Sequence, residues 1–428
     1  MRPAARKYRY VEAPRDFVSD SPFTLTHPSR SCWKGSNLAV AENDRIAETN
    51  AIFGQNRLKL GLFGINCDHA CAMTLVDEAF RLTWSSTREI AVTADRAGFE
   101  ALVPVARWKG IGDHDFNGRN FETYTWAAGL AEATENITLV TTAHVQATHP
   151  VVAAKAVSTI DHISGGRSCL NVVTGWFQPE FKMFGSELLD HDARYAYATE
   201  WTQLVKRLWS EEAEFNHLGK YFNVEGGYSM PKPVRSSLPP IMNAGVSAAG
   251  RTFIAEQADV GYVVLTDHAD LETGRRTLAG IRERAAQQGR EVCLWTTAYV
   301  VQRDTMKESK NYFERYVNEH GDESAGVATA HFLGVTAEAM SPNNYESFKT
   351  HLKAGYGGYP LIGTAEDVAS GLQLLSELGF DGVALTYVDF IDGLHRFNAD
   401  VMPALERAGL REPYVRRARW GSEQSDRG

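Results

Sequence analysis

Residues 137–175, ITLVTTAHVQATHPVVAAKAVSTIDHISGGRSCLNVVTG, decide the fold. Residues 137–143 are apolar and β-branched, which is typical of a buried strand, and residues 149–164 are typical of a helix. Residues 168–173 then form a second apolar run of strand length. A helix between two buried strands predicts one unit of a parallel sheet with a crossover helix.

The same alternation continues along the chain on both sides of this stretch. Strands are expected at 58–64, 99–105, 137–143, 168–175, 239–245, 260–266, 292–301 and 380–388. Helices are expected at 85–98, 120–134, 149–164, 192–209, 247–258, 270–288, 305–319, 365–379 and 393–408. Eight strand-plus-helix units of this size predict an α/β protein with a closed TIM (β/α)8 barrel, in preference to an open doubly wound sheet.

The regular alternation also sets the expected domain boundaries. The barrel is predicted to span residues 58–410, between an N-terminal extension, 1–57, and a C-terminal tail, 411–428. Two segments do not fit the unit and are expected to be insertions near 213–231 and 320–362. Insertions after strands lie at the C-terminal face of such a barrel, where active sites are built.

Composition narrows the class of partner. The chain has 428 residues, 43% of them hydrophobic, and a net charge of −9 with both signs mixed along it. Nucleic acid is therefore a poor candidate partner, because no basic face is evident. The first residues are charged where a secretory signal would be apolar, and we find no membrane span. Five scattered cysteines fit a reduced, cytoplasmic protein.

Polar residues gather at the predicted ends of several strands. Asn171 interrupts an apolar strand, and Thr142 and His144 stand at the end of the preceding one. Because the C-terminal ends of barrel strands form one catalytic face, these side chains are expected to lie together. A buried amide without a partner costs about 1–3 kcal/mol, so Asn171 must face either the protein or a ligand.

The stretch NAGVSAAGR, residues 243–251, has the pattern of an anion site. A strand that turns through Gly245 into a helix presents backbone N–H groups, the Ser247 hydroxyl and the positive helix end to one point. An ordinary turn capped by Ser247 explains the same pattern. Arg194 and Tyr195 open the helix after the fourth strand and could bind the same anion, or simply be solvated. Together these residues suggest a phosphorylated cofactor.

A metal site is not expected. NCDHAC, residues 66–71, places Cys67, His69 and Cys71 close together, but no second ligand pair with zinc spacing follows. A loop that lines the pocket after the first strand is the preferred interpretation.

Four motifs carry a resemblance to a known family. They are TIDHISGGRSCLNVVTGWFQPEF (159–181), HDARYAYATEWTQLVKRLW (191–209), NAGVSAAG (243–250) and LIGTAEDVASGLQLLSELGFDGVALTYVDF (361–390). The sequence resembles the bacterial-luciferase-like FMNH2-dependent monooxygenases, and within them the pyrimidine oxygenase and dimethylsulfone monooxygenase subgroup. The resemblance implies a TIM barrel, O2 as co-substrate, and reduced FMN delivered by a separate NAD(P)H:flavin reductase.

The resemblance also implies roles for individual residues. Asn171 and Thr142 would lie beside the flavin ring, near its N5 edge, and Val103 would form an aliphatic wall over the oxygen pocket. The residues expected to hold FMN are Thr142, Asn171, Gly175, Trp176, Arg194, Tyr195, Gly245, Val246 and Ser247. The residues expected to be catalytic are Asn171, Thr142, Val103 and His144.

Other residues have two interpretations. His144 could donate a proton or be a structural hydrogen-bonding group. Asp389 and His395 could shape the substrate side of the mouth or belong to a solvated loop with a capping Asp. Trp108 and Trp176 are further candidate substrate contacts, and aromatic walls suit a small organic compound. Few cationic residues follow the strands, so strongly anionic substrates are not favoured.

Two functional hypotheses stay open at this point. The first is a two-component monooxygenase that acts on a small sulfone, pyrimidine, halogenated aromatic or similar compound, as a homodimer or homotetramer. The second is an F420-dependent oxidoreductase, or a non-catalytic flavin-binding barrel, of the same superfamily. The Thr142 and Asn171 pair favours the first.

Overall fold

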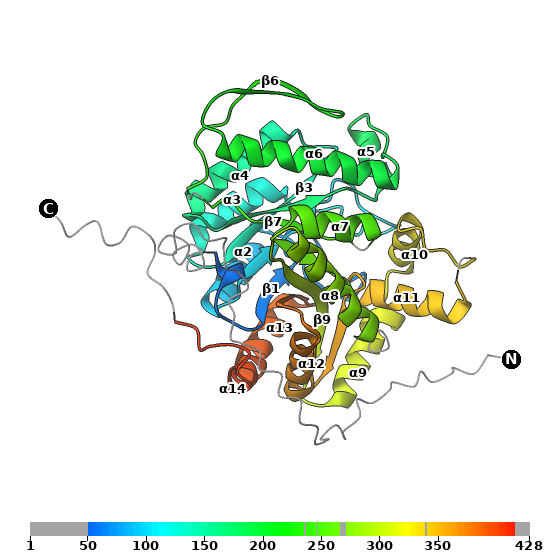
Figure 1. Cartoon of the computed structure of the whole chain (residues 1–428). Coiled ribbons are helices and arrows are strands. Elements are labelled where there is room, and N and C mark those ends of the chain that lie inside the picture. The colour runs from blue at the N-terminus through cyan, green and yellow to red at the C-terminus, as the bar shows by residue number, and fades with distance from the viewer. Residues whose placement is uncertain (1–49, 235–236, 246, 266–270, 339, 416–428) are drawn as a thin grey trace. The chain divides into compact units, whose positions relative to one another are not determined.

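The computed structural model describes residues 50–415, apart from residues 235–236, 246, 266–270 and 339. In this part of the chain, eight parallel strands close into a barrel (Figure 1). Their order is β1 (Lys59–Phe63), β2 (Ala101–Val103), β3 (Thr138–His144), β4 (Ser168–Val173), β7 (Ile241–Asn243), β8 (Val260–Tyr262), β9 (Cys293–Gln302) and β11 (Gly382–Thr386). Because β11 pairs with both β9 and β1, the ring is closed, and the predicted TIM barrel is confirmed.

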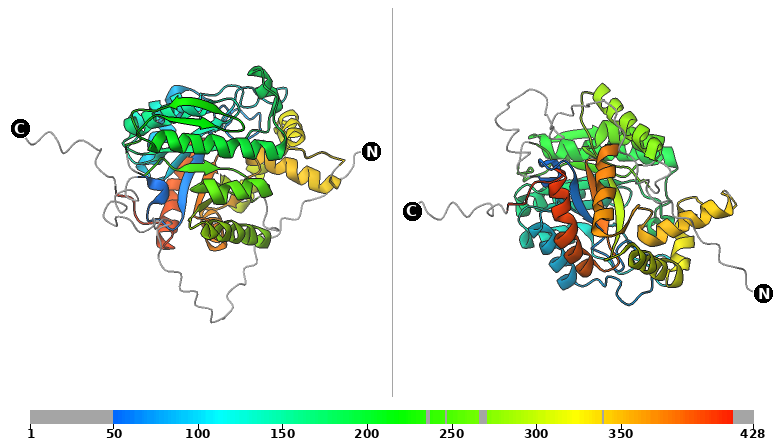
Figure 2. Two further views of the ribbon diagram at one scale, coloured as in Figure 1. Left: turned by 45° about the horizontal axis from the view of Figure 1, so that its top comes forward. Right: turned by 90° about the horizontal axis from the view of Figure 1, so that it is seen from below.

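Helices surround this ring of strands, as Figure 2 shows. They are α2 (Trp84–Arg96), α3 (Thr123–Ala133), α4 (Pro150–Ser164), α6 (His191–Ser210), α7 (Ala248–Gln257), α8 (Leu271–Gln287), α12 (Ala365–Leu378), α13 (Phe390–Arg396) and α14 (Met402–Arg407). Each helix from α2 to α8 packs on the next in this order, and α8 packs on α12. None of the described helices is long and apolar enough to span a membrane.

Local sequence signals fix where these helices start and stop. Helix α4 begins after His149, with Pro150 in its first turn, and ends at Gly165 in the left-handed conformation, φ 68°. Helix α12 begins with a capping box between Thr364 and Asp367. Proline at a helix start and glycine just past its end are the favoured residues at those positions, so the chain turns sharply into the next strand.

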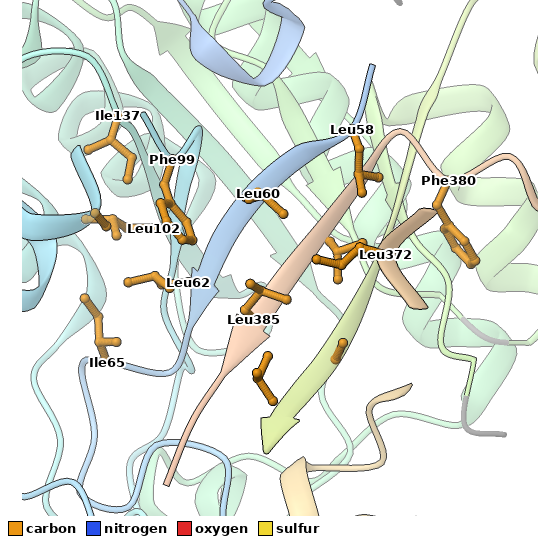
Figure 3. Close-up of a cluster of buried hydrophobic side chains, with 14 of the residues drawn as sticks. Leu58, Leu60, Leu62, Ile65, Phe99, Leu102, Ile137, Leu372, Phe380 and Leu385 are labelled. Atoms are coloured by element: carbon orange, nitrogen blue, oxygen red, sulfur yellow. The ribbon is translucent and has the colours of Figure 1, made fainter. Parts of the chain in front are cut away.

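The core has two layers around the strands. Outward-facing side chains such as Leu60, Leu62 and Leu385 pack against the helices (Figure 3). Inward-facing side chains fill the barrel, and Trp295 is the largest of them. Glycine is required beside this indole, because a Cβ at Gly382 would lie 2.3 Å from the Trp295 ring.

Two insertions add structure to the barrel. The first, expected near 213–231, contains the antiparallel pair β5 (Phe215–Leu218) and β6 (Asn223–Gly227). The second, expected near 320–362, contains α10 (Glu323–Phe332), α11 (Pro342–Gly355) and β10 (Tyr359–Gly363). The sequence did not predict β10, which runs parallel to the end of β9. Before this insertion, α9 (Met306–Glu314) continues as a π-helical turn, Arg315–Glu319.

Both ends of the described chain contact the barrel. Asn50, which the sequence assigns to the extension, donates a hydrogen bond to the Ser168 carbonyl and accepts one from Thr138. Arg411, which the sequence assigns to the tail, is buried and forms an ion pair with Glu100 at 2.9 Å. The remaining residues of the predicted extension, 1–49, lie outside the described residues.

Candidate active site

The ends of β3 and β4 hold a pair of hydrogen-bonded polar side chains inside the barrel mouth. Thr142 and Asn171 are directly opposite each other in the parallel register of these strands. Asn171 Nδ2 donates to Thr142 Oγ1 at 3.3 Å, and Thr142 Oγ1 donates to the Pro104 carbonyl at 3.1 Å. Three consecutive strand ends are thereby joined, which brings together the two residues that the sequence singled out.

Two buried amide oxygens at this mouth have no partner. Asn171 Oδ1 and Asn243 Oδ1 make no hydrogen bond with any described residue, although their side chains are 8% and 2% exposed. Asn243, at the end of β7, donates its amide N–H to the Val172 carbonyl at 2.7 Å. A buried acceptor left alone costs about 1–3 kcal/mol, so these atoms indicate a bound group. Asn243 was not among the residues selected from the sequence.

A buried ion pair covers the same strand ends. Arg107, in the loop after β2, lies 3.4 Å from Glu180 Oε1, and both side chains are almost fully buried. Glu180, on α5 (Gln178–Met183), also accepts from the backbone N–H of Trp108 at 2.6 Å. Burial raises the pKa of Glu180, whereas Arg107 and the backbone N–H donors act in the opposite direction. We refer to Thr142, Asn171, Asn243, Arg107 and Glu180 as the mouth cluster.

His144 is buried beside this ion pair and is uncharged at neutral pH. Burial, together with the nearby Arg107 charge, lowers the pKa of His144 to about 3. Its Nδ1 lies 3.8 Å from Glu180 Oε2, which is too long for a hydrogen bond. Of the two interpretations of His144, its burial argues against a charged imidazolium that donates a proton.

Aromatic rings form one wall of the mouth. The Arg107 guanidinium lies 5.0 Å from the Trp176 ring centre and 5.3 Å from that of Phe177. Gly175, at φ 88°, allows the chain to turn here, because a Cβ would lie 2.3 Å from the Phe181 ring. Trp108 is 43% exposed and contacts Phe184 at the rim.

Val103 and the cysteine loop occupy neighbouring positions. Val103 ends β2 and packs in the interior layer of the barrel with Val140 and Met242. Cys67 and Cys71 are buried with Val105 and contact the backbone of their own loop, so the loop after β1 packs against the loop after β2. Among the described residues, no three His, Cys, Asp or Glu side chains are grouped so as to hold a metal ion.

The residues expected at an anion site come together at the start of α7. Ser247 Oγ accepts a hydrogen bond from the Gly250 N–H at 3.1 Å, so Ser247 caps this helix. A Cβ at Gly250 would lie 2.6 Å from Tyr195 Oη, which places the phenol against the same turn. Val246 lies outside the described residues.

Arg194 connects this turn to the end of β4. Its Nη1 donates to the Gly175 carbonyl, while its Nε has no partner among the described residues. Burial lowers the pKa of Arg194. Because its Nε has no partner among the described residues, the partly buried Arg194 guanidinium can bind an anion from one side.

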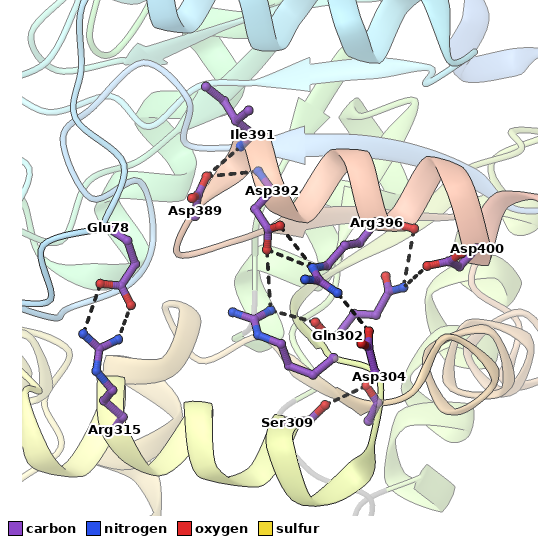
Figure 4. A network of polar contacts seen from close by, with 12 residues as sticks. Glu78, Gln302, Asp304, Ser309, Arg315, Asp389, Ile391, Asp392, Arg396 and Asp400 are labelled. Atoms are coloured by element: carbon purple, nitrogen blue, oxygen red, sulfur yellow. Dashed lines mark hydrogen bonds and ion pairs between the residues drawn. The ribbon is translucent and has the colours of Figure 1, made fainter.

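Asp389 and His395 belong to helix α13 (Phe390–Arg396) and its N-cap. Asp389 caps α13 by accepting from the N–H groups of Ile391 and Asp392 at 2.9 and 3.1 Å (Figure 4). It lines a small cavity, none of whose lining residues belongs to the mouth cluster. His395 is exposed on α13. We refer to Gln302, Asp304, Asp389, Asp392 and Arg396 as the outer network.

Comparison with known sequences assigns the chain to a family. The profile of the family described as luciferase-like monooxygenase matches residues 63–382. Pyrimidine monooxygenase RutA of Agrobacterium fabrum is 30% identical over 337 residues, which cover 76% of this chain and 90% of that protein. The FMNH2-dependent dimethylsulfone monooxygenase of Pseudomonas putida is 28% identical over 339 residues, which cover 76% of this chain and 89% of that protein.

Solved structures share the fold. Long-chain alkane monooxygenase LadA superposes with a TM-score of 0.74 at 23% identity, over 85% of this chain and 94% of that one. An F420-dependent secondary alcohol dehydrogenase superposes with a TM-score of 0.60 at 16% identity, over 83% of this chain and 99% of that one. At these identities the likeness establishes the architecture only.

Proposed function

The chain belongs to the luciferase-like monooxygenase family, and on that premise we propose that it is a two-component enzyme that uses reduced FMN and O2 to oxygenate a small organic compound. The observation that carries the proposal is the Thr142–Asn171 pair, with its unpartnered amide oxygen, at the ends of β3 and β4. The names of the two curated relatives describe enzymes that oxidise small molecules, and one of those names specifies FMNH2.

The residues present fit a flavin at two points. At the ring end, Asn171 and Asn243 each leave a buried amide oxygen without a partner, as a site for a ring with N–H groups would. At the phosphate end, Tyr195, Ser247 and Gly245 lie at the N-terminus of α7, a helix of 10 residues whose positive end attracts anions. A Cβ at Gly245 would lie 2.5 Å from Gly250, so glycine keeps this turn tight.

Reduced FMN, when bound, supplies the two electrons that activate O2. The role of the protein is to orient hydrogen bonds and exclude water. Asn171 uses one Nδ2 hydrogen for Thr142, so its second Nδ2 hydrogen and its Oδ1 are available to the bound groups. Thr142 Oγ1 donates to the Pro104 carbonyl, which fixes the direction of its lone pairs. Thr142 thereby holds the Asn171 amide, whose second Nδ2 hydrogen can stabilise negative charge that develops on oxygen.

Burial of the surrounding side chains keeps the reacting region dry. Val103 closes the inner side of the mouth with an apolar surface, and the rings of Trp176 and Phe177 cover it on the other side, under Arg107. Neutral His144 can contribute a ring N–H hydrogen bond, but at pH 7 it holds no additional proton to transfer. A water-poor site strengthens each of these interactions.

The electron supply is proposed to be a separate NAD(P)H:flavin reductase. The sequence contains no G-x-G-x-x-G dinucleotide motif between a strand and a helix. We further propose that the protein acts in the cytoplasm as a homodimer or homotetramer.

The test supplies reduced FMN with a flavin reductase under air and follows the loss of sulfone, pyrimidine and halogenated aromatic compounds. We expect faster loss when the protein is present, and incorporation of oxygen from 18O2 into the product. NADH and the protein alone should leave bound FMN oxidised. Turnover with reduced F420 under nitrogen, and none with reduced FMN under air, would instead support the F420-dependent alternative.

A further inference from the structure

Tyr356 belongs to the insertion between β9 and β10, yet its side chain reaches the mouth cluster. Arg107 Nη2 donates a hydrogen bond to Tyr356 Oη at 2.8 Å, across 249 positions of sequence. The ring is packed against Phe116 at 6.1 Å and against Cys67 and Val105 of the neighbouring loops. The insertion is thereby joined to the residues that follow β2.

The backbone at Tyr356 has an unusual conformation for this residue type. It ends α11 with φ 57° and ψ 32°, in the left-handed region that favours glycine. A non-glycine residue in this region is strained, and such strain persists where the side chain is required. Gly355, Gly357 and Gly358 surround it, so the only large side chain at this turn is the one that contacts Arg107.

The pair formed by Arg107 and Glu180 is longer than a well-aligned pair of these groups. Guanidinium and carboxylate groups prefer two parallel hydrogen bonds of about 2.7–2.9 Å. Here the nearest approach is 3.4 Å, and Arg107 Nε and Nη1 make no hydrogen bond with any described residue. Tyr356 binds Nη2 and Glu180 faces Nη1, so Nε is the buried donor without an acceptor, beside the ring wall of Trp176 and Phe177.

We infer that Tyr356 is a positioning residue that orients the Arg107 guanidinium so that its Nε–H is left to a hydrogen-bond acceptor on the substrate, such as a sulfonyl or carbonyl oxygen. Because Glu180 lies against Arg107 and His144 is neutral, the site favours an uncharged compound over an anion. This inference rests on the proposed function, since it takes the mouth cluster as the substrate side. On this inference, the insertion that contains α10, α11 and β10 contributes to substrate specificity through Tyr356.

The test is calorimetric titration of the FMN-loaded protein with three probes. Sulfolane carries two sulfonyl oxygens, tetrahydrothiophene is the same ring without them, and methanesulfonate is an anion. We expect sulfolane to bind most tightly. Tyr356→Phe should weaken sulfolane binding about fivefold or more, while FMN affinity and tetrahydrothiophene binding stay unchanged. The matched control is Tyr345→Phe, the same chemical change on the same insertion helix, which should leave sulfolane binding unchanged.

A double variant separates positioning from general damage to the fold. If Tyr356 acts through Arg107, then Tyr356→Phe should have no further effect on sulfolane binding in an Arg107→Lys background. Independent, additive losses would overturn the inference, as would unchanged sulfolane binding in Tyr356→Phe or no binding to the parent protein. Tighter binding of methanesulfonate than of sulfolane would contradict the uncharged class. A parent protein that fails to bind FMN would instead contradict the proposed function.

Discussion

The mouth cluster and the outer network both follow the carboxyl ends of barrel strands, but they differ in what their polar groups contact. In the outer network the charged groups bind one another: Arg396 pairs with Asp392 and Asp304, each at 3.1 Å (Figure 4). In the mouth cluster, polar atoms of Asn171, Asn243 and Arg107 are buried without a partner. In the outer network, Gln302 Oε1 is the one buried polar atom without a hydrogen-bond partner among the described residues.

This difference shows how a ligand site can be told from a structural network. Protein interiors rarely leave a buried donor or acceptor unpaired, because each costs about 1–3 kcal/mol. A network that satisfies itself contributes to the fold and needs no ligand. A cluster with several unpaired atoms on adjacent strands is stable only with a bound partner in place, or at a cost that function requires.

The largest effect is expected for Asn171→Ala in the mouth cluster. Loss of one donor to developing negative charge reduces turnover by about 10²–10³, roughly 2.7–4 kcal/mol. FMN affinity and melting temperature should change little, because the phosphate end is untouched. Thr142→Ala should show the same pattern with a smaller loss of turnover, because Thr142 accepts from Asn171 and orients its amide. If both variants melt several degrees lower yet keep the turnover of the parent protein, the mouth cluster stabilises the fold and has no part in catalysis.

A smaller effect is expected at the start of α7. Ser247→Asp places a carboxylate beside the proposed phosphate, so FMN binding should weaken by roughly 10–100-fold. Riboflavin, which lacks the phosphate, should lose far less affinity. Flavin fluorescence titration measures both constants, and Ser247→Thr is the conservative control. If FMN and riboflavin lose equal affinity, the phosphate does not bind at Ser247, Tyr195 and Gly245.

Features of the fold and the site that depend on residues close together in the sequence could be predicted, and features that depend on distant residues could not. The eight strands and their helices follow from local periodicity and caps, such as Gly165 after α4. Strand β10 was missed because only its pairing with the distant end of β9 makes it a strand. Asn171 and Thr142 were found because a polar residue in a buried strand is unusual in any local window.

Residues whose role depends on a distant partner were missed. Glu180 follows Pro179 at the start of a short helix, and locally it looks like an ordinary first-turn acid. Only the fold brings Arg107 to it, 73 positions earlier in the chain, and buries both. Asp389 had two interpretations from the sequence, a substrate contact or a capping residue, and the structure shows that it caps α13.

The buried His144 beside the mouth cluster predicts how the stability of the protein depends on pH. The folded protein holds the pKa of His144 at about 3, below its usual value near 6.5, so the unfolded chain binds a proton first as pH falls. The contribution of neutral His144 to the free energy of unfolding is therefore fully present above pH 6.5, and it is lost as the pH falls from 6.5 toward 3. Between pH 7 and pH 5 this group should account for about 2 kcal/mol of the loss.

The measurement is urea unfolding of the parent protein and of His144→Gln at pH 7, 6 and 5. The variant should lose about 2 kcal/mol less of its unfolding free energy over this interval, because Gln takes up no proton. Parallel curves for the two proteins would mean that His144 takes up a proton as readily in the fold as in the unfolded chain, and hence that it could donate a proton at the mouth.

The smallest effect is expected for Asp389→Ala in the outer network, and it tests the other side of the comparison. Asp389 accepts from two N–H groups at the start of α13, so its loss removes a helix cap, worth about 0.5–2 kcal/mol. The melting temperature should fall by a few degrees, while turnover per folded molecule and substrate KM stay at the parent values. Asp389→Asn is the matched control, since asparagine caps helices as well as aspartate does and should restore the melting temperature. A rise in substrate KM in both variants, although Asp389→Asn keeps the cap, would show that Asp389 contacts the substrate. The outer network would then be part of the substrate site.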